Sequence, residues 1–190
     1  RSRGGEHFVI FTSGLDTAYS QQSPDTVSMV FAGITSKGRF VQLDERVYNN
    51  ADLAQPLAPS DISKNYFDFL ERNRREWGLA RNTFIDSADQ ATRTELLKFK
   101  RNNACLYVFN NAWKKVQIID RIMLVSGWLK TGHWFILEGC ANTIHEFENY
   151  AWDEKADNTP EDNNDHCINA GQYAFIPYRD KIGDIENGAD

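Results

Sequence analysis

The sequence has few cysteines and none in a paired motif. Cys105, Cys140 and Cys167 lie far apart, and no C-x-x-C pair occurs. This spacing argues against a zinc site and against a framework of paired disulfides. We therefore expect buried free thiols in a reducing compartment.

Long apolar runs are also missing. No stretch approaches the roughly 18 consecutive apolar residues of a membrane-spanning helix. Residues 1–6 lack the apolar centre of a signal peptide, and we interpret them as a linker or the remnant of a tag. Residues from about 180 to 190 are expected to form a flexible tail. The chain of 190 residues is long enough for one domain with a sizeable core.

The chain lacks an excess of positive charge: 27 acidic residues outnumber 21 Lys and Arg, and the net charge is −6 at pH 7. Binders of nucleic acid are usually basic, since neutralisation of phosphates drives their affinity, so tight autonomous DNA binding is not expected. A nuclease is not excluded, because clustered carboxylates that hold metals lower the pI and another domain can deliver the substrate. The motifs G-x-x-x-x-G-K-[ST], G-x-S-x-G and H-E-x-x-H are absent, which argues against an ATPase in this chain and against two common hydrolase sites.

Apolar periodicity predicts a mixed α/β domain. Three strands come first, at 7–15, 26–34 and 39–48, and Ser36-Lys37-Gly38 forms a hairpin turn between the last two. Strands and helices then alternate and end in two helices. The expected strands are 82–86, 105–109 and 133–137, and the expected helices are 62–77, Ser87 or Asp89 to about 101, 118–129, 142–152 and 166–175. This order predicts a mixed sheet, three antiparallel strands followed by parallel ones, with helices on its faces.

Two acidic residues, Asp16 and Asp86, stand where a predicted strand ends. The carboxyl ends of strands line the ligand crevice of an α/β sheet, so the two side chains are expected to lie close together. Two such charges are costly unless a cation lies between them, and carboxylate oxygens select Mg²⁺ or Mn²⁺. With a third ligand from a late helix, the site could hold two ions roughly 3.5–4 Å apart. The simpler alternatives are that Asp86 caps a helix and that Asp16 begins a turn.

Several short motifs follow one another in a distinctive order. They are Gly14-Leu15-Asp16, Ser23-Pro24-Asp25-Thr26, Phe84-Ile85-Asp86-Ser87-Ala88, Lys114-Lys115, Glu146-Phe147-Glu148-Asn149-Tyr150 and the segment 162–174. The ordered set resembles the C-terminal nuclease domain of tailed-phage terminase large subunits, in which the fifth motif corresponds to an "EFxxY" element. The resemblance covers about residues 8–178, and no single motif in it is specific.

The resemblance implies an RNase H-like fold and endonuclease activity. The implied reaction is cleavage of concatemeric double-stranded DNA during phage genome packaging in the host cytoplasm, with two Mg²⁺ or Mn²⁺ ions as cofactors. The implied partners are DNA, an ATPase domain of the same full-length protein, the portal and the small terminase subunit, and no membrane. Because the P-loop is absent, the chain looks like an excised C-terminal domain without its motor.

The resemblance also implies the site residues. Asp16 and Asp86 correspond to metal ligands, and the last helix of the relevant branch begins "NHxxDA", in which the Asp is the third ligand. His166 matches the histidine, but Asn169 occupies the position of that Asp. Asparagine offers one neutral carbonyl oxygen, so metal affinity should fall. Asp165 could substitute for it, although a helix N-cap explains this residue better.

We consider three explanations for Asn169: an inactivating substitution, which we favour, a natural variant, and a family member that uses Asp165. His166 could transfer protons beside the site, or it could be a surface histidine at a helix start. Lys114 and Lys115 could contact phosphates, or they could be a solvated pair in a loop. Two rival functions stay open. One is a Holliday-junction resolvase or transposase-like enzyme, and the other is a non-catalytic module that grips DNA or docks the motor to the portal.

Overall fold

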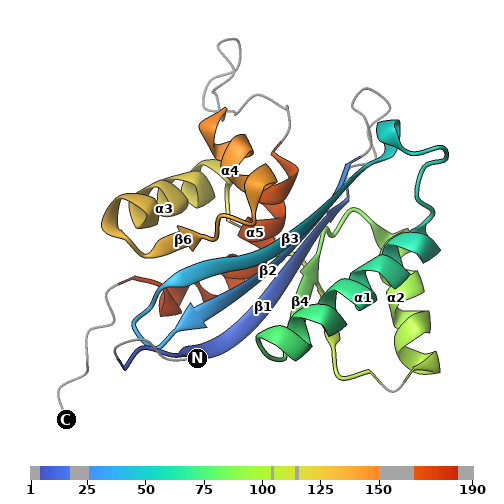
Figure 1. Ribbon diagram of the computed structural model, residues 1–190, viewed down its shortest axis with the longest axis horizontal. Helices are drawn as coiled ribbons and strands as arrows, with labels where there is room; N and C mark the ends of the chain where they lie inside the picture. The colour runs from blue at the N-terminus through green and yellow to red at the C-terminus, as the bar shows by residue number, and fades with distance from the viewer. Residues whose placement is uncertain (1–4, 18–25, 104, 114–115, 150–164, 184–190) are drawn as a thin grey trace.

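The computed structural model describes residues 5–17, 26–103, 105–113, 116–149 and 165–183 (Figure 1). Among these residues, no helix is both long and apolar enough to cross a membrane. Asp25, Lys114 and Lys115, which belong to motifs singled out in the sequence, lie outside the described residues.

The sheet has six strands in the order β5-β4-β1-β2-β3-β6. Strands β1 to β3 pair antiparallel, whereas β4 is parallel to β1, β5 to β4 and β6 to β3. The predicted mixed sheet is therefore confirmed. The strands are β1 Phe8–Thr17, β2 Thr26–Thr35, β3 Phe40–Asn49, β4 Asn82–Ile85, β5 Val108–Asn111 and β6 Trp134–Ile136.

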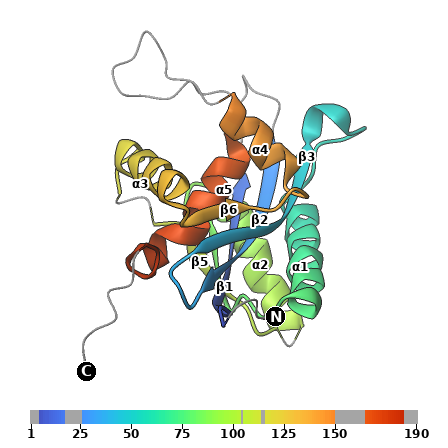
Figure 2. The same ribbon diagram turned by 60° about the vertical axis from the view of Figure 1, so that its left-hand side comes forward.

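Helices cover both faces of the sheet (Figures 1 and 2). Helices α1 and α2 lie on one face, and α3, α4 and α5 lie on the other. The helices are α1 Pro59–Glu76, α2 Gln90–Asn102, α3 Ile118–Thr131, α4 Ala141–Glu148 and α5 His166–Phe175, with short 3-10 turns η1 Asn50–Asp52 and η2 Ile176–Lys181.

This double covering explains the apolar composition of β2. Met29 and Phe31 belong to the core beneath α1 and α2, whereas Ala32 and Ile34 belong to the core beneath α3 and α5. All four side chains are fully buried. A strand buried on both faces shows a continuous apolar run instead of a polar alternation.

The structure corrects some local expectations and decides between others. Strand β5 begins at Val108, where pairing with Asn82 begins, and not at residue 105; Leu106 is exposed. Asp89, not Ser87, caps α2, because its Oδ1 accepts the Thr92 backbone N–H at 2.9 Å.

The expected linker and the expected tail each contain a residue that contacts the folded domain. Glu6 forms an ion pair with Arg39 at 3.0 Å, so it is part of the folded domain. Ile182 is 8% exposed and packs in the core beneath α3 and α5. Helix α4 ends at Glu148, with Asn149 as its C-cap.

Helix α5 packs very closely along β1 and runs in the opposite direction. The Thr12 hydroxyl donates to the Ala174 carbonyl at 3.0 Å, and a Cβ placed on Gly14 would lie 1.8 Å from the Ala170 oxygen. Four residues of helix rise about 6 Å and two residues of strand rise about 6.6 Å, so this pairing can continue in register. Only glycine at position 14 allows the helix backbone to come this close.

We expect Gly14→Ala to lower the free energy of unfolding by about 1–3 kcal/mol or more, because the new methyl group meets helix backbone that cannot move aside alone. Urea unfolding measures this change. Gly127→Ala is the matched control: Gly127 lies in α3, its added Cβ would meet no atom within 4 Å, and the variant should gain about 0.5–1 kcal/mol. Equal stability of the two variants would contradict the close approach.

Candidate metal centre

Asp16 faces α5 because of strand alternation. Its neighbour Leu15 is buried in the core beneath α1 and α2, so Asp16 points to the opposite face of the sheet. There the pairing of every second residue of β1 with every fourth residue of α5 continues from Gly14 to Asp16, and His166 Nδ1 lies 3.1 Å from Asp16 Oδ2. Asp16 is 5% exposed. Asp16 lies within β1, so the alternative that it begins a turn is wrong.

Asp86 follows β4 directly and lies beside β1. Its backbone N–H donates to the Leu15 carbonyl at 3.0 Å, which extends the parallel pairing of the two strands. One carboxylate oxygen, Oδ1, accepts the Ala88 backbone N–H at 2.9 Å and closes a local turn. The other, Oδ2, accepts the Tyr173 hydroxyl at 3.5 Å. Asp86 therefore closes a turn before α2 with one oxygen, and the alternative that it caps this helix is wrong, because Asp89 is the cap.

The charge of Asp86 acts on the carboxylate of Asp16. Burial raises the pKa of Asp16, the hydrogen bond and charge of His166 oppose this, and the nearby charge of Asp86 raises it further. Tyr173 also forms a hydrogen bond with Asp16, so its hydroxyl links the two acids. Strand ends that are far apart in sequence therefore bring Asp16 and Asp86 together, as the sequence predicted.

Burial and the neighbouring acids have opposing effects on the pKa of His166. Burial alone would lower the pKa of its imidazole, but the hydrogen bond and charge of Asp16, with the charges of Asp165 and Glu146, raise the pKa overall. The protonated ring is therefore favoured among these acids. His166 is at the site and is not a surface histidine, since its side chain is only 12% exposed.

Asn169 lies on the same face of α5 as His166 and Tyr173, because residues three, four and seven apart share a helix face. Its side-chain amide Nδ2 donates to Asp165 Oδ1 at 3.0 Å. Asp165 occupies the N-cap position, but its side chain makes no capping hydrogen bond. The two residues proposed for the third ligand position are therefore held together as an amide–carboxylate pair.

Glu146 is a site residue for which the sequence suggested no role. Its two carboxylate oxygens accept the backbone N–H groups of Cys167 at 3.0 Å and Ile168 at 2.8 Å. Burial raises the pKa of Glu146 to about 7, although these hydrogen bonds lower it. Its place in the EFxxY-like element was the one sequence signal that pointed to it.

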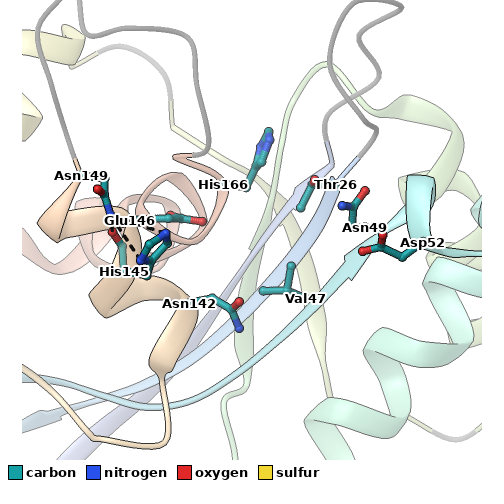
Figure 3. Close-up of a pocket in the computed structure, with 9 residues that line it drawn as sticks. All are labelled: Thr26, Val47, Asn49, Asp52, Asn142, His145, Glu146, Asn149 and His166. Carbon is teal, nitrogen blue, oxygen red and sulfur yellow. Dashed lines mark hydrogen bonds between the residues drawn. The ribbon is translucent and has the colours of Figure 1, made fainter.

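A polar cleft of about 510 Å³ opens beside the acids. Residues of α4 form one side, and residues of β2, β3 and η1 form the other (Figure 3). His166 lines the cleft and also contacts Asp16, so it connects the two. The lining residues are Thr26, Val47, Asn49, Asp52, Asn142, His145, Glu146, Asn149 and His166.

The acid pair fits a hard divalent cation, but its protein ligand set is incomplete. Asp16 is a desolvated carboxylate whose charge is costly next to Asp86, which is the situation that a bound cation relieves. Within the described part of the chain, no group of three His, Cys, Asp or Glu side chains could hold a metal ion.

The sheet order and the acid pair beneath a late helix define an RNase H-like domain of the nuclease type. The family model described as the terminase RNaseH-like domain matches residues 13–177, and the chain belongs to that family. A search of curated proteins finds no significant match.

Solved structures agree on the fold. The large terminase from the thermophilic bacteriophage D6E, in complex with ADP, superposes with a TM-score of 0.69 at 18% identity, covering 90% of this chain and 40% of that one. The large terminase nuclease from thermophilic phage G20c with bound magnesium gives a TM-score of 0.56 at 10% identity, covering 92% and 88%. The same nuclease is also known with bound cobalt and with bound zinc. The chain thus spans about 40% of the length of the D6E protein, and the expected RNase H-like fold is confirmed.

The raised pKa of Glu146 predicts a pH dependence of stability. A carboxyl group with a higher pKa in the folded than in the unfolded chain favours folding while it is protonated, and this contribution is lost as the pH rises through the folded value. The window runs from the ordinary value of 4.5 to about 7. Across it, the wild type should lose on the order of 3 kcal/mol of stability relative to Glu146→Gln. Urea unfolding of both proteins between pH 4.5 and 8 measures the difference, and parallel curves would contradict it.

Proposed function

We propose that this chain is the metal-dependent endonuclease domain of a phage DNA-packaging terminase. Its substrate would be concatemeric double-stranded DNA, cleaved by phosphodiester hydrolysis with two Mg²⁺ or Mn²⁺ ions. The observation that carries the proposal is the buried carboxylate of Asp16 beside Asp86 at the carboxyl edge of two parallel strands. Family membership and the divalent ions bound by the G20c nuclease support it.

In this proposal Asp16 and Asp86 hold the metal, and the residue at 169 completes the ligand set. Bound divalent ions would supply activation of water and stabilisation of the leaving 3′ oxygen. His166 orients Asp16 through Nδ1, and because it also lines the cleft it can exchange a proton with a group there. Tyr173 orients Oδ2 of Asp86. Lys114 and Lys115 are proposed to contact the DNA backbone.

The other partners follow from the family and stay proposals. The chain covers part of the D6E large terminase, whose structure contains ADP, so we expect an ATPase domain in the full-length protein. The portal, the small terminase subunit and the host cytoplasm complete the proposed setting.

We expect Asn169→Asp to yield Mn²⁺-dependent nicking of plasmid DNA, because the new carboxylate supplies the charge that the ligand set lacks. Adding Asp16→Ala to this variant should abolish the nicking. Asp68→Ala, which removes an exposed acid on α1, is the control and should leave it unchanged. If Asn169→Asp shows no metal-dependent cleavage and a soaked crystal holds no metal, the site assignment is wrong.

Binding of metal should also stabilise the domain. With Mn²⁺ at a hundred times its dissociation constant, the gain is about 2.7 kcal/mol, seen as a rise in Tm that EDTA reverses. Asp16→Asn should lose this rise, and without metal it should be more stable than the wild type at neutral pH, because burial disfavours the charged Asp16. An unchanged Mn²⁺ response in Asp16→Asn would exclude Asp16 as a ligand.

Asn169 favours one alternative function, a non-catalytic module that grips DNA or docks the motor. DNA binding by the wild type without cleavage by any variant would support that alternative. A preference of the active variant for four-way junctions over linear DNA would instead support a resolvase-like enzyme.

A further inference from the structure

The EFxxY-like element has no role in the function proposed above, yet its glutamate makes a specific contact. Glu146 extends from α4 to the start of α5, and each of its carboxylate oxygens accepts one backbone N–H there, at 3.0 Å from Cys167 and 2.8 Å from Ile168. Figure 3 places it among the residues that line the cleft. A polar contact between two helices is thus made at the end of α5 that carries His166.

The first turn of a helix needs such acceptors. Its first N–H groups have no partner within the helix, and a negative charge near them is favourable. The N-cap residue, Asp165, does not supply its side chain, which accepts from Asn169 instead. Glu146, although it belongs to α4, therefore accepts the N–H groups of α5 that an N-cap side chain normally accepts.

Helix α4 is itself fixed to the sheet by an acid of the same kind. Glu45 of β3 accepts the backbone N–H groups of Asn142 at 2.6 Å and Thr143 at 3.0 Å, at the start of α4. Two glutamates thus connect β3 to α4 and α4 to α5. The connection ends at the helical turn that carries His166 and Asn169.

We propose that Glu146 is a positioning residue of the nuclease site, which holds the first turn of α5 so that His166 and Asn169 face Asp16. This role rests on the proposed function, but its geometry does not, since His166 Nδ1 contacts Asp16 Oδ2 directly at 3.1 Å. Glu146 acts through the helix backbone, whose N–H groups at Cys167 and Ile168 it accepts.

The test compares Glu146→Ala and Glu146→Gln with Glu148→Ala, which removes an exposed glutamate from the same helix. Three quantities are measured at a temperature where each protein is folded: Mn²⁺ affinity by calorimetry, amide hydrogen exchange at Cys167 and Ile168, and the imidazole NMR signals of His166. We expect Glu146→Ala to weaken Mn²⁺ binding 10–100-fold, as loss of a supporting partner does at other metal sites. Exchange at the two amides should accelerate, and the His166 signals should shift.

The glutamine variant keeps one acceptor oxygen, so we expect an intermediate effect, and Glu148→Ala should match the wild type. If Glu146→Ala loses protection in every helix, its fold has failed, and Glu146→Gln decides the question by the same readouts. The proposal is overturned if both Glu146 variants have the same amide exchange rates and the same His166 signals as the wild type. If neither the wild type nor Asn169→Asp binds Mn²⁺ or cleaves DNA, the proposed function is overturned, while exchange and His166 signals still decide the role of Glu146.

Discussion

The close packing of α5 across β1 is the constraint on which the site depends. Because position 14 has no side chain, the Ala170 carbonyl reaches the strand backbone, and the register that begins at Thr12 and Ala174 ends with His166 at Asp16. A larger residue at position 14 would push the helix outward along its whole length. The sheet therefore fixes the position of the site through backbone contact as much as through polar side chains.

The site costs stability in the metal-free protein. Asp16 is buried beside Asp86, and the partial compensation comes from His166. Buried carboxylates of this kind are retained where function requires them, at the expense of the folded state. Glu146 combines a similar cost and benefit. Burial disfavours its charge, but its ionised form supplies two acceptors to the start of α5.

The sequence was sufficient for features that depend on local pattern. The strands and helices followed from periodicity, and the meeting of Asp16 with Asp86 followed from the rule that parallel strands end at one edge. Contacts made across the fold could not be predicted. The cap that Glu146 gives to α5 depends on how α4 lies against it, and the start of β5 depends on its pairing with Asn82, not on the apolar run that begins at Cys105.

Asn169 determines the charge at the start of α5. With the amide at this position, Asp165 receives a hydrogen bond at 3.0 Å, and the pair carries one negative charge. An aspartate in the same place would bring two carboxylates to that separation, which is costly unless a proton or cation is shared between them. The asparagine therefore gives the first turn of α5 an uncharged partner for Asp165, whereas in the proposed site it would remove a charge that attracts a metal ion. In the proposed site, geometry and affinity for an ion are thus separable properties.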